Sequence, residues 1–281
     1  MSLTELQYVH LTQDRPDSIA VLTLNRPESA NAFNQKTIES IIKNLDDVRS
    51  LNSSNSNCRA LVITGRGKHF SAGADLAWMK QSQTLSAEEN LAETRRMAQM
   101  FENLWTFPIP TLAAVHGSVF GGAVGLVGCA DIALASSKAV FCLSEVKVGL
   151  HPAVILPYLA RKMPAGHLKR LSLSGRTFSA DEALNYGLVE AVVPECELED
   201  AIKHEIEQIL LGSPVAQRAF KGLFLEMEAH HMQPGDYTAQ AISRTRTLRS
   251  AEEGMRAFLE KTDPPWTIKA GFLENFRFLK W

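Results

Sequence analysis

The chain has 281 residues, and 29 Lys and Arg side chains against 31 Asp and Glu leave a formal net charge of −2. Hydrophobic residues make up 45% and charged residues 21%, a globular composition that excludes a disordered or fibrous protein. The near-zero charge argues against nucleic acid as a partner, and the length allows one large domain, with or without a smaller appendage.

The four cysteines lie far apart without a CxxC pair, which excludes a cysteine zinc site or a disulfide scaffold and favours a reducing compartment. The first residues, MSLTELQYVH, lack the basic and apolar regions of a secretory signal. We therefore expect a cytoplasmic protein.

Strand and helix signals alternate through the first two thirds of the chain. Strands are expected at residues 8–11, 19–24, 60–64, 111–115, 131–135 and 140–143, and helices at 34–49, through 78–79, at 87–105 and at 123–129. From residue 154 the pattern is mostly helical, with capping-box sequences SADE at 179–182 and SAEE at 250–253. This order indicates an α/β core followed by a helical C-terminal region.

Residues 111–130 have no charged side chain and are long enough to cross a bilayer. Their five glycines would weaken an uninterrupted helix by about 0.8–1 kcal/mol each relative to alanine. A strand, a glycine turn and a short buried helix explain those glycines, so we expect no membrane span.

Two segments share the form strand, glycine-containing turn, helix: ALVITGRGKHFSAGADL and TLAAVHGSVFGGAVGL. Phosphate-binding glycine motifs, a GxSxG elbow and an HExxH zinc helix are absent, and the adjacent His230 and His231 lack metal-site spacing, so no metal is expected. Free backbone amides at two helix starts would bind an oxyanion if they converged on one point. Glycine before a helix also fits simple packing.

Five segments together resemble the signature sequences of the enoyl-CoA hydratase/isomerase (crotonase) superfamily, in the family's order: NRPESANAFN, HFSAGADL, HGSVFGGAVGL, AVFCLSEVKVGLHP and EGMRAFLEK. The resemblance implies a spiral of ββα units over residues 1–198 that contains the active site. It also implies a helical oligomerisation region over 199–266, which builds a homotrimer or a dimer of trimers. Residues 267–281 form a tail of unknown role.

The resemblance implies that two backbone amides stabilise the enolate of an acyl-CoA thioester. Carried over by position, these amides belong to Ala72 and Gly122. The CoA portion is expected to lie against Gly73, Ala74, Asp75, Leu76 and Gly121, with Phe258 and Lys261 reaching it from a neighbouring subunit. CoA is part of the substrate, and no separate cofactor is expected.

Glu145 is the expected acid–base residue, because it matches the family's C-terminal catalytic glutamate. The segment FCLSEVKVGL places its carboxylate among apolar neighbours just after a strand, where burial would raise its pKa. From the residues alone, an ordinary ion pair with Lys147 is the alternative.

Two positions depart from the family pattern. Gly125 stands where many hydratases carry a second glutamate, and a lone glutamate is also the arrangement of family isomerases. GLHPAVI replaces a proline and a glycine-rich turn, so His151 and Val154 should reshape the acyl pocket. These features most resemble bacterial methylglutaconyl-CoA and isohexenylglutaconyl-CoA hydratases, whose substrate carboxylate would need a partner such as His151 or Lys147.

Three functions stay open at this point. The first is a hydratase that adds water to an enoyl-CoA, with 3-methylglutaconyl-CoA as the leading substrate. The second is an isomerase that moves the double bond with Glu145 alone. The third is a catalytically weak, crotonase-like binding module, for which RNA is disfavoured by the acidic charge balance.

Overall fold

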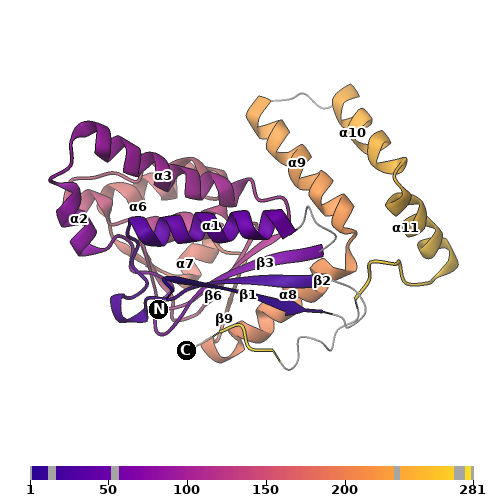
Figure 1. The fold of residues 1–281 in the computed structure, drawn as a ribbon, viewed down its shortest axis with the longest axis horizontal. Helices are drawn as coiled ribbons and strands as arrows, with labels where there is room; N and C mark the ends of the chain where they lie inside the picture. Colours follow the sequence, from indigo (N-terminus) through magenta and orange to yellow (C-terminus); the bar gives the residue numbers. More distant parts are fainter. Residues whose placement is uncertain (1, 12–16, 52–56, 231–234, 269–275, 280–281) are drawn as a thin grey trace.

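The computed structural model describes residues 2–11, 17–51, 57–230, 235–268 and 276–279 (Figure 1). Within them, a six-stranded sheet has the order β1-β2-β3-β4-β6-β9. Its strands are β1 (Thr4–His10), β2 (Asp17–Leu24), β3 (Asn57–Gly65), β4 (Thr111–Val115), β6 (Ile132–Ser136) and β9 (Ala191–Val193). β1 and β2 pair antiparallel, and each following pair is parallel.

A smaller sheet has the order β5-β7-β8, formed by β5 (Ser118–Phe120), β7 (Val140–Cys142) and β8 (Thr177–Ser179). The chain alternates between the two sheets: β4 leads to β5 and then to helix α4 (Gly122–Cys129), and β6 leads to β7 and then to further helices. This repeat confirms the expected spiral of ββα units.

Successive residues of the central strands face opposite sides of the large sheet, as the period of two requires. On one face, Leu22, Leu61 and Ala113 pack in a core with α1 (Gln35–Leu51), α3 (Ala87–Trp105) and α4. On the other face, their neighbours pack against α8 (Leu198–Leu211). Figure 1 shows α1 and α3 above the sheet and α8 below it. The second core also buries Phe278 and Leu279, so the described end of the C-terminal tail helps to cover this face.

The remaining helices surround this core. They are α2 (Leu76–Ser82), α5 (Leu156–Lys162), α6 (Ala165–Ser174), α7 (Ala180–Asn185), α9 (Pro214–His230), α10 (Asp236–Arg246), α11 (Arg249–Glu260) and the 3-10 helices η1 (Pro27–Ser29), η2 (Glu145–Val148) and η3 (Glu195–Glu197). The backbone of His230 ends α9, and His231 lies outside the described residues.

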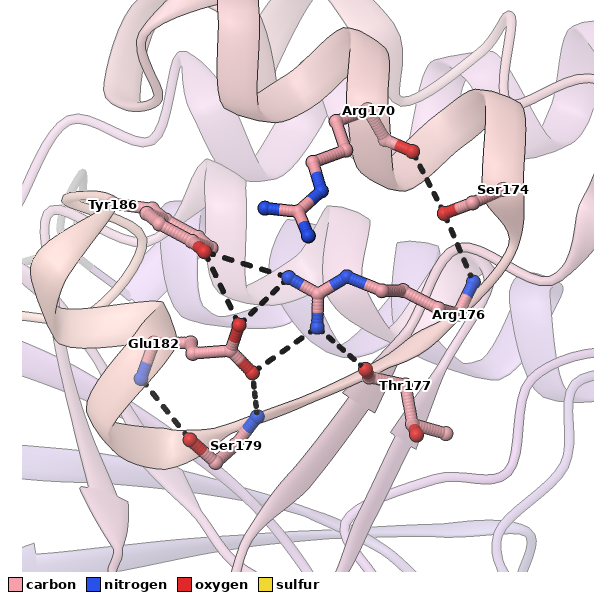
Figure 2. Close-up of polar contacts among 7 residues, drawn as sticks. All are labelled: Arg170, Ser174, Arg176, Thr177, Ser179, Glu182 and Tyr186. Atoms are coloured by element: carbon pink, nitrogen blue, oxygen red, sulfur yellow. Dashed lines mark hydrogen bonds and ion pairs between the residues drawn. The ribbon is translucent and has the colours of Figure 1, made fainter.

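One of the two predicted capping boxes is confirmed. The Ser179 hydroxyl accepts the Glu182 amide at 3.2 Å, and the Glu182 carboxylate accepts the Ser179 amide at 3.1 Å. Figure 2 shows Arg176 donating to the same carboxylate, and this hydrogen bond lowers the pKa of Glu182 to about 2. The prediction at 250–253 was wrong, because α11 starts at Arg249 and Ser250 lies inside it.

Three helices, α9, α10 and α11, stand out from the α/β core (Figure 1). At their base, the buried Lys221 ammonium donates to the Ile109 carbonyl at 2.9 Å and pairs with the Asp131 carboxylate. These helices and the link between α10 and α11 expose large apolar side chains: Phe220, Phe224, Ile242, Leu248, Met255, Phe258 and Leu259. Oligomerisation through this region and the domain boundary at residue 198 stay predictions.

The apolar stretch at residues 111–130 forms β4, β5 and α4, as the strand–turn–helix interpretation expected except for the short strand β5. Across the described ranges, no helix has the length and apolar character needed to span a membrane.

Candidate active site

A cavity of about 400 Å³ opens where the two glycine-containing turns meet. The turns contribute Ala74 and Gly122, and η2 contributes Glu145. Helices α2 and α3 form one wall, and residues 148–155 form another. The cavity therefore gathers the residues that the two turns and the glutamate were predicted to bring together.

The first expected amide requires a correction. The Ala72 N–H donates to the Ala30 carbonyl at 2.9 Å, so it is not available to a ligand. Ala74 instead forms a parallel bridge with Phe33, in which Phe33 bonds to Gly73 and Asp75 on either side of Ala74. In a parallel bridge the bonded groups belong to those flanking residues, so the Ala74 N–H points away from Phe33. No hydrogen bond of this amide is found within the described chain.

The second amide is available as predicted. Gly122 is the first residue of α4, where a helix leaves its N–H groups without internal partners. The neighbouring Gly121 amide is used, because it donates to the Cys142 carbonyl at 2.8 Å. A Cβ on Gly73 would lie 2.8 Å from the Phe120 carbonyl oxygen, so the two turns touch and only glycine fits between them. The Ala74 and Gly122 amides thus border one cavity.

Glu145 lies beside these amides. Its Oε1 is 3.3 Å from the position that a Cβ on Gly121 would take. Its Oε2 is buried without a hydrogen-bond partner among the described residues, and burial raises the pKa of the carboxyl group. No ion pair with Lys147 is found among the described residues. A buried acid with an open oxygen suits proton transfer to a bound ligand.

The residues expected to contact CoA divide into two groups. Gly73, Leu76 and Gly121 line the cavity, and the Leu76 side chain is 82% exposed at its mouth. The Asp75 carboxylate is used within the protein: it accepts the Ala77 amide at 2.9 Å and the Arg26 guanidinium at 2.8 Å. Burial opposes its ionisation, yet the Arg26 hydrogen bond and the amides at the start of α2 lower its pKa.

Phe258 and Lys261 lie at the end of α11 and do not line this cavity. Phe258 is 81% exposed. Their expected role therefore requires the site of another subunit, and it stays a prediction.

One of the two departures from the family pattern has a physical explanation, and the other lies in the cavity wall. A Cβ on Gly125 would lie 2.2 Å from Ile155 Cγ2 and 2.9 Å from Phe101 Cε1, so no side chain fits there. Ile155 fills the place toward which a second glutamate would project. His151 lines the cavity, as does Val154. The Lys147 side chain lies against Gly175 instead.

Sequence reasoning missed the polar residues that α2 and α3 contribute. Asn90, Glu93 and Thr94 follow helical spacing along the face of α3 that lines the cavity, next to the apolar Met97. From α2, the Trp78 indole N–H donates to the Glu93 carboxylate at 3.0 Å. The helical period of α3 predicted its apolar face but gave no sign that a cavity lies beside this polar one.

Comparisons with known proteins identify the family to which the chain is similar. The family model described as enoyl-CoA hydratase/isomerase matches residues 14–269. A crotonyl-CoA hydratase from Syntrophomonas wolfei is 32% identical over 259 residues, which cover 91% of this chain and 97% of that protein. A short-chain-enoyl-CoA hydratase from Clostridium acetobutylicum is 31% identical over 255 residues, 88% of this chain and 94% of that protein. The crystal structure of an enoyl-CoA hydratase from Shewanella pealeana superposes with a TM-score of 0.84 at 36% identity, covering 93% of this chain and 95% of that one.

Proposed function

This chain belongs to the enoyl-CoA hydratase/isomerase family, and from that premise we propose that it hydrates a branched glutaconyl thioester, with 3-methylglutaconyl-CoA as the leading substrate. Enoyl-CoA hydratase activity at the general level is supported by its relatives. The observation that carries the proposal is a pair of available backbone amides, those of Ala74 and Gly122, beside the buried Glu145 carboxyl group.

In the proposed reaction, the two amides donate to the thioester oxygen and polarise the conjugated double bond. Water attacks the β carbon, and negative charge collects on the thioester oxygen as the enolate forms. Removing one such donor typically costs about 100- to 1,000-fold in rate. Glu145 then delivers a proton to the α carbon. We propose that the reaction needs no cofactor beyond the CoA of the substrate.

The acyl group is proposed from the cavity's polar residues. A 3-methylglutaconyl group ends in a carboxylate, which needs a donor or cation once it leaves water. His151 lines the cavity, whereas Lys147 lies against Gly175, so His151 is the better partner.

The substrate proposal is tested with crotonyl, methylcrotonyl, methylglutaconyl and isohexenylglutaconyl thioesters. We expect the methylglutaconyl thioester to have the highest kcat/KM, and His151→Ala to lower that value while leaving crotonyl-CoA hydration unchanged. A preference for crotonyl-CoA that His151→Ala does not alter would contradict the glutaconyl assignment.

A second function, double-bond isomerisation, is favoured by one observation: no second carboxylate fits at Gly125. Product analysis separates the two reactions. Consumption of a conjugated enoyl-CoA without formation of a hydroxyacyl-CoA would favour the isomerase.

We also propose a homotrimer, single or paired, built by α9, α10 and α11. Their exposed apolar side chains support this proposal, because patches of this kind on a monomer mark interaction surfaces. Light scattering tests it, and a fully active monomer would contradict both the trimer and the roles of Phe258 and Lys261 at a neighbouring site.

A further inference from the structure

Hydration requires a group that positions the attacking water and takes its proton. Glu145 serves the α carbon in the proposed reaction, and a second carboxylate cannot stand at Gly125, because Ile155 and Phe101 occupy the space. A water-binding group separate from Glu145 has to come from another part of the cavity wall.

Glu93 is a carboxylate on that wall. It projects from α3, lines the same cavity as Ala74, Gly122 and Glu145, and is half-buried. The Trp78 indole N–H donates to its Oε2 at 3.0 Å from the facing helix α2. This bond holds the carboxylate through Oε2, and Oε1 has no hydrogen-bond partner among the described residues, so it is open to accept from water.

The backbone that carries Trp78 is itself held in place. The Asp75 carboxylate caps α2 by accepting the Ala77 amide at 2.9 Å and the Trp78 amide at 3.4 Å. Arg26 holds that cap through an ion pair of 2.8 Å. The indole is thus attached to the turn that carries Ala74, so the position of Glu93 is coupled to the oxyanion-binding amides.

We propose that Glu93 is the second acid–base carboxylate of this site, held in place by Trp78 and acting on the attacking water in place of a residue at Gly125. The inference rests on the proposed hydratase function. It adds a residue to the reaction and names Trp78 as its positioning residue.

The proton balance is complete. The Glu93 carboxylate takes one proton from water as the water oxygen bonds to the β carbon, and the π electrons of the double bond move to the thioester oxygen. Glu145, protonated at this stage, gives its proton to the α carbon as the enolate collapses. The product has gained the elements of water, and both carboxyl groups return to their starting states by proton exchange with solvent.

The test compares hydration with a reaction that needs no attacking water. Exchange of the α protons of a saturated acyl-CoA in D₂O uses the two amides and Glu145 alone. We expect Glu93→Gln to lower kcat for hydration by about 100-fold or more, the usual range for an acid–base group, and to leave the exchange rate unchanged. Trp78→Phe keeps the ring but removes the donor, and we expect an intermediate loss of about tenfold in hydration alone.

Glu88→Gln is the matched control, because Glu88 is an exposed carboxylate on the same helix outside the cavity. It should leave both rates unchanged. If Glu93→Gln hydrated the thioester at the wild-type rate, or lost hydration and α-proton exchange to the same extent, the proposed role of Glu93 would be overturned. A wild-type enzyme that exchanges α protons but hydrates no thioester would overturn the hydratase proposal itself, and the role of Glu93 with it.

Discussion

Gly125→Ala tests whether steric packing against neighbouring side chains excludes a side chain at this position. The added methyl group would lie 2.2 Å from Ile155 Cγ2 and 2.9 Å from Phe101 Cε1, whereas carbon atoms normally approach to about 3.5–4.0 Å. Overpacking a core by one methyl typically costs about 1–3 kcal/mol, and so short a contact belongs at the upper end. The higher helix propensity of alanine relative to glycine offsets about 1 kcal/mol of this loss in helix α4. The expected net loss is about 2 kcal/mol in the free energy of unfolding.

Thermal and denaturant unfolding measure this loss at one fixed protein concentration, because association would otherwise shift the midpoint. A loss of about 2 kcal/mol corresponds to a Tm lower by about 4–8 °C. Gly166→Ala is the control: Gly166 lies in α6 with open space around it, so the same substitution should be neutral or stabilising.

A double-mutant cycle identifies the source of the clash. Ile155→Ala alone should cost about 2–5 kcal/mol, because Ile155 is buried. It also removes Cγ2, so the double variant should be more stable than the sum of the single losses predicts, by about 1–3 kcal/mol. A Gly125→Ala variant as stable as the wild type, or an additive double variant, would refute the reasoning.

Three further predictions concern the site and the second core. Glu145→Gln should lower hydration by about 100- to 10,000-fold and raise the free energy of unfolding at neutral pH. Burial raises the pKa of Glu145, so the stability that the protonated carboxyl group contributes is fully present below the usual pKa near 4.5 and is lost as pH rises through the folded-state pKa. Denaturation at several pH values should therefore show that Glu145→Gln is more stable than the wild type at neutral pH and that this difference disappears in acid. Gly122→Val should displace an oxyanion donor, because Phe33 already lies 3.3 Å from a Cβ there, and rate assays should show hydration and α-proton exchange falling together by about 100-fold. Phe278→Ala should cost about 3–5 kcal/mol in unfolding assays without changing kcat, since Phe278 packs on the sheet face opposite the cavity; a fall in kcat would show that the tail reaches the site.

The long periodic elements of the fold could be predicted from sequence. Of the three-residue strands, β7 was expected at 140–143, but β5, β8 and β9 were not. The helix expected at 87–105 is α3, because its apolar spacing, its polar start and the prolines after it agree. β8 and β9 have three residues each and lie in a region predicted to be helical. Three residues are too few to show a period of two, and these strands form because neighbouring strands already offer a sheet edge.

The sequence predicted which segments form the site, but not which backbone amide in the first turn is left unbonded. Both glycine turns and Glu145 meet as expected, yet the Ala72 amide is bonded to the Ala30 carbonyl, and the amide of this turn that is unbonded at the cavity, among the described residues, is that of Ala74. Regular alternation would point the Ala72 and Ala74 amides, two residues apart, to the same side of an extended segment. The positive φ of Gly73 (91°) between them breaks that alternation, and the sequence alone does not reveal it. Glu93 was missed for a related reason: one polar residue on an amphipathic helix looks like any other until the facing helix α2 encloses it.

In the proposed reaction, stabilisation of the enolate and activation of water depend on different parts of the chain. The amides of Ala74 and Gly122, proposed to bind the oxyanion, are oriented by backbone topology, through a bridge to Phe33 and a helix start. The group proposed to act on water, Glu93, is a side chain, and the need for it follows from local volumes such as that of Ile155 beside Gly125. Enolate stabilisation should therefore persist in variants of α2 and α3, while the balance between hydration and isomerisation should shift with them. Glu93→Gln should accordingly increase the ratio of isomerised to hydrated product from a thioester open to both reactions, and a fixed ratio would show that one group controls both.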